Sequence, residues 1–523
     1  MTAFPCISFP WISVLTTIPV LGALTVFAIG GRNQKLARWT ALSFSFLSLA
    51  LTLLLWHRFD ASSGGLQFQQ WHNWIPALNV QYHVGIDGLG LLMLLLTSIV
   101  VPIGMAASAQ IQDRVSLYYA LMLLLQSCLV GTFTTLNFIP WFLFWELSLI
   151  PAFFLIKLWG GPQRSKAATQ FLVYTMVGGA GLLLSFLAIF LATHKFDFIE
   201  LTALAQSGQL MPSVIDKLAW HRISTQHIEL LLFAGAFLGF AIKVPLFPFH
   251  TWLPSAYSEA PTGTTILLTG AMSKMGLYGS LRILLPIFGP QMQLVLTPLL
   301  WLSVATIIFS AYAALAQKDI KRIFAYSSIN HLGYCLLAIF AVVKSTGGDA
   351  ALTAEKFAAL NGVFLQIFNH GLTAATLFWF IALLEKRSGG LRGLNDFGGL
   401  RKVAPVFAGL MGISLFSSLG LPGLNGFIGE FLIFKGTFPL ATWASSLAVI
   451  GLLTTAIFIL GFIQRVFSGP LNQRWASLSD LSTGERVALA PVIGLMFTLG
   501  FYPQLILGAV NSTVIQLVQN LKF

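Results

Sequence analysis

The sequence predicts an all-α protein that crosses a membrane many times, because of its composition, its long apolar segments and the placement of its basic residues. Of its 523 residues, 56% are hydrophobic and only 9% are charged, whereas a soluble domain carries about 25% charged residues. A transmembrane helix needs about 20 mostly apolar residues, and about fourteen such segments fit this chain. They leave too little sequence for a sizeable soluble domain.

The predicted helices are spread over the whole chain, with starts that are good to a few residues. The first apolar run has neither a basic leader nor a cleavage site, so we expect a retained helix and not a signal peptide. The fourteen helices are expected to begin near Trp11, Ala37, Val84, Val115, Leu136, Lys166, Ile228, Gly263, Leu294, Ile323, Lys356, Ala404, Ala444 and Arg486.

The basic residues support this count and set an orientation. With the N-terminus outside and the helices alternating, 18 of the 29 Lys and Arg residues fall on one side, 8 on the other and 3 within the membrane. Cytoplasmic loops carry such an excess of Lys and Arg. The net charge of +12 is therefore explained by the bilayer, and we expect no nucleic-acid partner.

Two segments should interrupt their helices inside the membrane. Lys243–Pro254 contains three prolines, and Gly420–Glu430 combines a proline with several glycines. Proline lacks a backbone N–H and clashes with the preceding turn. Non-helical backbone at membrane depth is tolerated only where protein buries it or water reaches it. Both segments are therefore candidate parts of a transport path.

The interruptions fall in the seventh and twelfth predicted helices, which suggests two five-helix repeats of inverted orientation. Paired interrupted helices in an inverted repeat point to a transport site. We expect an N-terminal three-helix segment at 1–112, a first repeat at 113–286, a second repeat at 287–468 and a C-terminal helix at 469–523.

Four ionisable residues lie within long apolar runs: Glu146, Lys243, Lys274 and Glu430. A charge at the bilayer centre costs roughly 2.5–3.5 kcal/mol even on mild scales, so such residues usually mark proton or ion pathways. Burial disfavours the charged form of each group and an opposite charge favours it. If Glu146 and Lys243 meet, each sets the proton affinity of the other. The alternative is a static buried ion pair that only fixes helix packing.

Histidines are suited to link such sites, because imidazole titrates near neutral pH. His331 and His370 lie in apolar helices, and His250 lies in the first interrupted segment. Lys435 lies near a helix end, where it could also reach the membrane surface. We take His331 and His370 as candidate relay residues, and His250 and Lys435 as weaker candidates.

The chain lacks the motifs of nucleotide or redox-cofactor binding. It has no phosphate-binding loop, no dinucleotide fingerprint and no H-E-x-x-H motif. Its three cysteines are isolated, so they form neither an iron–sulfur motif nor a redox pair. We expect no cofactor and no metal in this chain.

Four motifs, in order along nearly the whole chain, resemble the antiporter-like subunits of respiratory complex I. With a glutamate at position 430, the chain resembles the chain-4 type of these subunits. The resemblance implies fourteen helices, one proton channel, main relay roles for Glu146, Lys243, Lys274 and Glu430, and connecting roles for His331 and His370. Asp87 matches a family motif without a clear chemical role. The motifs are Asn137–Pro151, Lys243–Pro254 followed by Glu259–Pro261, Lys321–Tyr334 and Leu421–Glu430.

The resemblance also implies partners and cofactors outside this chain. Related antiporter-like membrane subunits would surround it. Other subunits of the oxidoreductase, a translocase, would carry electrons from NAD(P)H or ferredoxin through iron–sulfur clusters to a quinone. The chain looks most like the cyanobacterial and chloroplast type, which uses plastoquinone. Ser255, Tyr257 and Thr262–Thr265 depart from the usual family form, as in divergent paralogues of carbon dioxide uptake complexes. This type would place the chain in a thylakoid membrane with its N-terminus on the lumenal side, and would link it to photosynthetic electron transport.

The sequence thus predicts a proton-translocating subunit of a quinone oxidoreductase complex. Protons would load from the basic side near the first interruption and leave outside. A chain of carboxylates and lysines without a cluster of oxygen ligands favours H⁺ over Na⁺. Three alternatives remain: a subunit of a multi-subunit cation/proton antiporter, a static membrane scaffold, and a solute permease, which would need a pocket at the membrane midplane.

Overall fold

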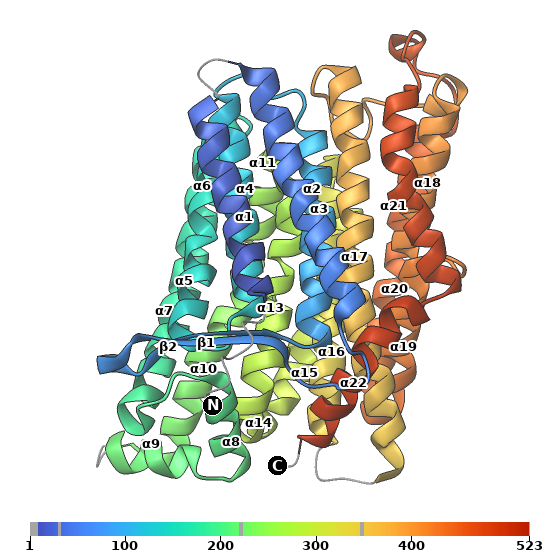
Figure 1. The fold of residues 1–523 in the computed structure, drawn as a ribbon. Coiled ribbons are helices and arrows are strands. Elements are labelled where there is room, and N and C mark those ends of the chain that lie inside the picture. Colours follow the sequence, from blue (N-terminus) through green and yellow to red (C-terminus); the bar gives the residue numbers. More distant parts are fainter. Residues whose placement is uncertain (1–8, 30–32, 219–222, 346–349, 522–523) are drawn as a thin grey trace.

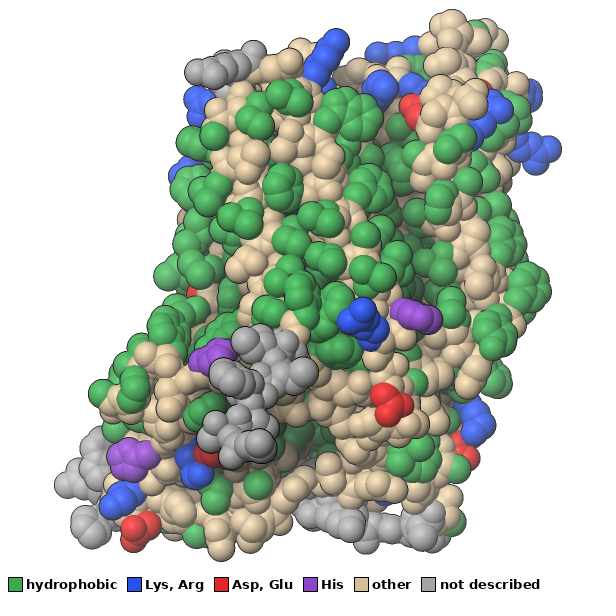
Figure 2. Space-filling view, in the orientation of Figure 1, with side chains coloured by type: hydrophobic (Ala, Val, Ile, Leu, Met, Phe, Trp, Pro, Cys, Tyr) green, Lys and Arg blue, Asp and Glu red, His purple; other side chains and the backbone are tan. Residues whose placement is uncertain are grey.

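The computed structural model describes residues 9–29, 33–218, 223–345 and 350–521. These ranges form a bundle of long, roughly parallel helices, with a two-stranded hairpin and short helices across one end (Figure 1). Hydrophobic side chains cover the middle of the face in Figure 2, and Lys and Arg side chains gather at the end away from the hairpin. This pattern fits a bundle whose sides face lipid.

Twelve helices in the described part of the chain are long and apolar enough to cross a membrane. The most deeply buried are α3, α16 and α17, whereas α1, α2 and α21 lie at the periphery. The twelve spans are α1 (Trp11–Ile29), α2 (Gln34–Arg58), α3 (Gly88–Ala107), α4 (Val115–Thr134), α5 with α6 (Phe138–Leu147 and Leu149–Trp159), α7 (Arg164–Thr193), α10 (Thr225–Lys243), α15 (Leu296–Leu315), α16 (Ile320–Lys344), α17 (Thr353–Ser388), α20 (Thr442–Phe462, extended by a π turn, Ile463–Phe467) and α21 (Thr483–Phe501).

Two further membrane segments expected from the sequence consist of shorter pieces. One runs from Thr262 to Leu294 and alternates α-helical and π-helical turns. The other is the pair α18 (Pro405–Leu419) and α19 (Asn425–Leu440). The all-helical membrane fold is confirmed, while the number fourteen and the inverted repeats stay predictions. The pieces of the first segment are α12 (Thr262–Leu267), η2 (Leu268–Met272), α13 (Lys274–Gly279), η3 (Ser280–Leu284) and α14 (Leu285–Leu294).

Both predicted helix interruptions are present. α10 ends at Lys243, and α11 (Trp252–Glu259) begins after eight intervening residues. Trp252 Nε1 donates a hydrogen bond to the carbonyl of Ile242 (3.0 Å), which fixes the two helix ends together. At the second interruption Gly420 and Gly423 adopt φ of +80° and +92°, a region that side chains disfavour. The prolines and glycines therefore act as the sequence indicated.

A hairpin and short helices close the end of the bundle that lies away from the clustered Lys and Arg side chains (Figure 1 and Figure 2). β1 (Gln67–Ile75) and β2 (Val80–Ile86), linked by η1 (Pro76–Leu78), pair antiparallel between α2 and α3. α8 (Phe198–Gln206) lies between α7 and α10, and α9 (Leu210–Leu218) follows it. The last helix, α22 (Gln504–Gln519), is separate from α21. We call this end the hairpin side; the charge bias predicts it to be the outer side.

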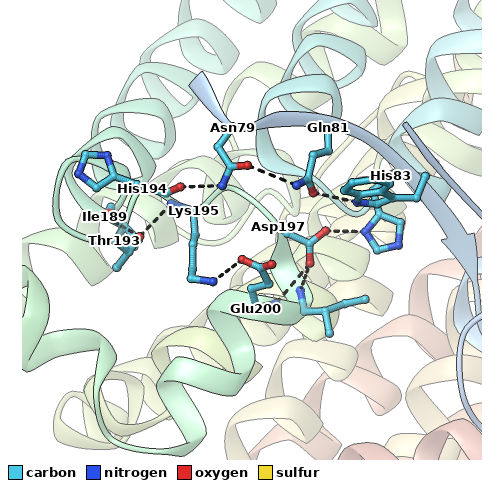
Figure 3. Close-up of polar contacts among 11 residues, drawn as sticks. Asn79, Gln81, His83, Ile189, Thr193, His194, Lys195, Asp197 and Glu200 are labelled. Atoms are coloured by element: carbon cyan, nitrogen blue, oxygen red, sulfur yellow. Dashed lines mark hydrogen bonds and ion pairs between the residues drawn. The ribbon is translucent and has the colours of Figure 1, made fainter. Parts of the chain in front are cut away.

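Figure 3 shows how the hairpin is fastened to α8. His83 Nδ1 on β2 lies 2.5 Å from Asp197 Oδ2, and Asp197 Oδ1 accepts the N–H groups of Ile199 and Glu200 in the first turn of α8 (Figure 3). Asn79 Nδ2 donates to the carbonyl of His194 (3.0 Å). The carbonyl of His83 also accepts the N–H of Leu136, just before α5. The hairpin, α8 and the start of α5 are thus one connected unit.

Candidate functional site

Lys274 stands at the beginning of a row of buried polar side chains in the centre of the bundle. It opens α13 directly after a π turn and is fully buried. The N–H of Ser273 donates to the carbonyl of Leu268, five residues back, and the Thr269 carbonyl instead accepts a hydrogen bond from Lys274 Nζ. Lys274 Nζ also lies 2.9 Å from His370 Nδ1 on α17. The π turn thus helps to hold the ammonium group at the histidine.

The row continues through two histidines to Glu430. The ring centroids of His370 and His331 are 5.1 Å apart, and His331 Nδ1 lies 2.8 Å from Glu430 Oε1. Gln366, one turn before His370 on α17, donates from Nε2 to the same carboxylate oxygen (3.1 Å). Lys274, His370, His331 and Glu430 come from α13, α17, α16 and α19, and all are buried. Gln366 gave no signal in the sequence, because a neutral amide is ordinary in a helix.

The second interruption is fastened to α17 beside this row. Asn369 Nδ2 donates to the carbonyl of Asn425 (2.6 Å), and Asn425 Oδ1 accepts from Ser417 Oγ (2.6 Å). Asn425 Nδ2 completes the set by donating to Thr373 Oγ1 (3.3 Å). Within the interruption, the N–H groups of Gly420 and Leu421 donate to the carbonyls of Ser417 and Phe416, so freed backbone groups find protein partners, as membrane burial demands. These bonds fix where α19 begins and so where Glu430 points.

Glu146 and Lys243 form a separate part of the site. Lys243 is buried at the end of α10, and its Nζ lies 4.8 Å from the ring centroid of Trp145. Between these two described residues the structure shows no ion pair, and both Glu146 Oε1 and Lys243 Nζ lack hydrogen-bond partners. Gly179 on α7 leaves room for the carboxylate of Glu146, because a Cβ there would collide with it. The possible contact between the two groups is not made in this conformation.

The two parts approach each other where α10 passes α13. Gly276, half a turn beyond Lys274, permits this close packing, since a Cβ there would lie 2.9 Å from the backbone N of Val244. Small residues commonly allow such approaches in membranes. Lys243 and Lys274 are therefore on neighbouring segments, although the described residues provide no direct hydrogen bond between them.

Two candidate residues lie outside the row. His250 is buried between the rings of Phe247 and Phe309, at centroid distances of 5.6 and 5.1 Å, and its Nδ1 has no hydrogen-bond partner. Lys435 is about half exposed at the hairpin side and pairs with Glu355 at 3.5 Å. The structure thus brings neither of them to Lys274, His370, His331 or Glu430.

Asp87 has a buried partner that the sequence did not indicate. Its carboxylate caps α3 by accepting the N–H of Gly90 (3.0 Å) and forms an ion pair with Arg282 on η3. Within the described ranges, no cluster of three or more His, Cys, Asp or Glu side chains could hold a metal ion.

A sequence profile described as "NADH:quinone oxidoreductase/Mrp antiporter, TM" matches residues 135–457, which contain the whole row and both interruptions. The chain belongs to this family. NADH-quinone oxidoreductase subunit M of Rhodobacter capsulatus is 32% identical over 515 residues, which are 97% of this chain and 96% of that protein. Subunit M of Mycobacterium tuberculosis H37Rv is 32% identical over 544 residues, with 97% and 93% covered.

Solved structures have the same fold. A chain of respiratory complex I from Thermus thermophilus with bound NADH aligns with a TM-score of 0.81 at 26% identity, covering 98% of this chain and all of that one. A chain of the Mrp complex from Dietzia sp. DQ12-45-1b aligns with a TM-score of 0.79 at 20% identity, again covering 98% and 100%. The latter likeness is one of fold alone.

Proposed function

We propose that this chain is a proton-translocating membrane subunit of an NADH-quinone oxidoreductase complex, the complex I type. The observation that carries the proposal is the row Lys274–His370–His331–Glu430, in which each neighbour is within hydrogen-bond or ring-contact distance. Every member can bind and release a proton, and such groups are costly to keep in a membrane. The names of the relatives in R. capsulatus and M. tuberculosis support the type of complex.

Lys274 and His370 can exchange a proton directly, because Lys274 Nζ and His370 Nδ1 lie 2.9 Å apart. When Lys274 is charged, its ammonium donates, and a proton that moves along the bond leaves a neutral amine and an imidazolium. The adjacent His331 ring and the carboxylate of Glu430 can take up the charge in turn.

Glu146 and Lys243 are the proposed loading site on the basic side. Neither Glu146 Oε1 nor Lys243 Nζ has a hydrogen-bond partner, so each is free to respond to a change in the other's charge. The first interruption, next to Lys243, gives a place where water can approach. We propose no part in the transfer from Lys274 to Glu430 for the two weaker candidates, His250 and Lys435, because the structure places both away from the row.

Electron transfer is proposed to occur in other subunits. This chain offers no iron–sulfur motif and no nucleotide-binding motif, so NAD(P)H or ferredoxin, iron–sulfur clusters and quinone would be bound elsewhere in the complex. Other antiporter-like membrane subunits are the proposed neighbours, since the structural relatives come from multi-subunit complexes.

The finer part of the proposal concerns the kind of complex. We retain plastoquinone as the acceptor, a thylakoid membrane and a link to carbon dioxide uptake, supported by the departures at Ser255, Tyr257 and Thr262–Thr265. The purified complex should then turn over faster with plastoquinone than with ubiquinone or menaquinone. A preference for either of the other quinones would contradict this finer assignment.

The main test is Lys274→Ala in the intact complex, reconstituted into sealed vesicles. We expect slowed quinone reduction and loss of coupled proton uptake, because Lys274 is the first group of the row. Lys435→Ala is the matched control, since an exposed ion pair contributes only about 0–1 kcal/mol and lies outside the row.

Assembly is checked first, by purifying each variant with its partner subunits. Unchanged pumping by an assembled Lys274→Ala complex would favour the static scaffold. Purification of the native chain with no redox subunit, together with Na⁺-dependent proton movement, would favour the cation/proton antiporter.

A further inference from the structure

A cavity of about 290 Å³ opens on the hairpin side, between the start of α3, α8, η3 and the end of α22. Figure 1 shows α8 and α22 at this end of the bundle. Its wall includes both apolar and polar side chains, and it is large enough for several water molecules. The polar lining consists of Asp87, Thr202, Gln206, Arg282, Thr513, Gln516 and Asn520.

The buried ion pair Asp87–Arg282 forms the membrane-facing part of this lining. Arg282 Nη2 contacts Asp87 Oδ1, while Arg282 Nε has no hydrogen-bond partner. The guanidinium carbon also lies 5.9 Å from the ring centroid of Tyr278, within range of a cation–π contact. Arg282 therefore contacts Asp87 and Tyr278 at once, and a buried Asp87 whose partner shifts fully onto Tyr278 must find a proton or another donor.

The same helical run leads from this ion pair to the proton row. Lys274, Tyr278 and Arg282 follow one another at intervals of four residues and so share one side of the helix. The eight residues from Lys274 to Arg282 correspond to about 12 Å along the axis. Tyr278, buried between them, donates its hydroxyl to the carbonyl of Phe133 (3.0 Å). Polar groups thus continue from Lys274 toward the cavity.

We propose that this cavity is a second outward route for protons, in which Asp87 is the release group and Arg282 the gate. The inference rests on the proposed proton-translocating function. The proton leaves the ammonium of Lys274, crosses on water past Tyr278 and binds the carboxylate of Asp87 once Arg282 has moved toward Tyr278. Asp87 then loses the proton to water in the cavity and pairs with Arg282 again. Arg282 stays charged throughout, because guanidinium does not deprotonate in proteins.

The wall formed by α8 is held in place by the contacts of Figure 3. Asp197 caps α8 and pairs with His83 of the hairpin, and Lys195 donates to Glu200 (2.6 Å). Phe198, Ile199 and Thr202 of this helix line the cavity. A fastened wall means that a side chain enlarged on α8 would fill the passage and would not simply displace the helix.

The test uses single cysteines on α8 in the intact complex, with the three native cysteines replaced by alanine. Thr202→Cys places a thiol on the cavity wall, and Ser207→Cys places one at the exposed end of the same helix, outside the lining. The purified complex is treated with a positively charged methanethiosulfonate and reconstituted into sealed vesicles. The expected result is a partial loss of coupled proton uptake on labelling Thr202→Cys, because the row to Glu430 stays open, and no loss on labelling Ser207→Cys.

A second pair of variants tests the ion pair itself. Asp87→Asn with Arg282→Gln removes both charges and leaves no unpaired buried charge, and we expect it to lose part of the proton uptake in an assembled complex. Normal pumping by this double variant, or by labelled Thr202→Cys, would overturn the route. Lys274→Ala in the same assay separates the two proposals: if it alone lowers uptake, only this second route fails, and if it has no effect, the translocating function itself fails.

Discussion

His331 is the side chain whose geometry most constrains how a proton could pass. Its Nδ1 faces Glu430 Oε1 at 2.8 Å and its Nε2 faces Ser418 Oγ at 3.2 Å, so both ring nitrogens have partners and the ring orientation is fixed. His370, 5.1 Å away between ring centroids, lies on the side of Lys274. A side chain at this position that makes hydrogen bonds but cannot bind an extra proton would keep the packing and would no longer relay protons.

We therefore expect His331→Gln to slow proton transfer through this chain by about 100-fold or more, the scale on which positioned acid–base groups act. The measurement is coupled proton uptake by the reconstituted complex. His250→Gln is the matched control, because that ring is equally buried but packs against Phe247 and Phe309 without a polar partner. Equal loss in both variants would contradict a specific role for His331.

The sequence predicted the members of the row but not their surroundings. Lys274, His370, His331 and Glu430 stand out because ionisable groups are rare in apolar helices. His250 gives the same signal, yet the structure places it among aromatic rings, which shows that sequence position alone cannot tell a relay group from a packed one. Gln366 and Ser418 are neutral and common in helices, so only their distances to Glu430 and His331 identify them.

At the scale of elements, the loop that precedes α21 fastens the start of α18. Asp480 accepts the N–H groups of Val406 and Phe407, each at 2.9 Å, in the first turn after Pro405. Burial raises the pKa of Asp480, but the N–H groups of Val406, Leu481 and Phe407 outweigh it, and the pKa lies below its ordinary value. Since α18 leads directly into the second interruption, this contact helps to position Glu430.

Asp480→Asn should destabilise the protein by about 1 kcal/mol, as loss of a helix-capping carboxylate does. Because the folded pKa is lowered, the stabilisation is complete above the unfolded value of about 3.9 and is lost as the pH falls through the folded value. Thermal unfolding of the purified protein should show a lower Tm for the variant at pH 7 and a smaller difference below pH ~3.9.

The exposed Asp113 provides the control for this prediction. It pairs only loosely with its neighbour Arg114, at 3.9 Å and with most of both side chains exposed. Asp113→Asn should leave the Tm unchanged at either pH. A Tm difference for Asp480→Asn that does not depend on pH would show that the carboxylate charge is not what stabilises α18.

Which elements could be predicted depended on local chemistry. The interruptions at 244–251 and 420–424 follow from proline and glycine, whose backbone limits are intrinsic. The hairpin did not show in the sequence, because most of β1 is exposed and Gln67–Ile75 lacks the alternation of a half-buried strand. The π turns at Leu268–Met272 and Ser280–Leu284 change one hydrogen bond each and leave no mark in residue type.

At the scale of the whole molecule, ionisable groups extend from the partly buried Glu146 on α5 through buried groups on α10, α13, α17 and α16 to α19. The fold class followed from hydropathy, but the order of contacts along this line did not, because it depends on which faces of α16 and α17 turn toward each other. Long-range packing alone brings Lys274 to His370, 96 residues away along the chain.

Because these groups form one line, we expect them to transfer a proton one after another. Lys243 and Lys274 lie on neighbouring segments at the α10–α13 contact, and a proton loaded at Lys243 has to pass Lys274. Once either lysine is replaced by alanine, proton transfer stops, so replacing the other lysine as well should lower proton uptake no further. We expect Lys243→Ala with Lys274→Ala to pump no worse than the more severe single variant. The measurement compares coupled proton uptake by the two single variants and the double variant, after confirming equal assembly. Independent routes through the two halves would instead give losses that multiply, because the effects of uncoupled sites add as free energies.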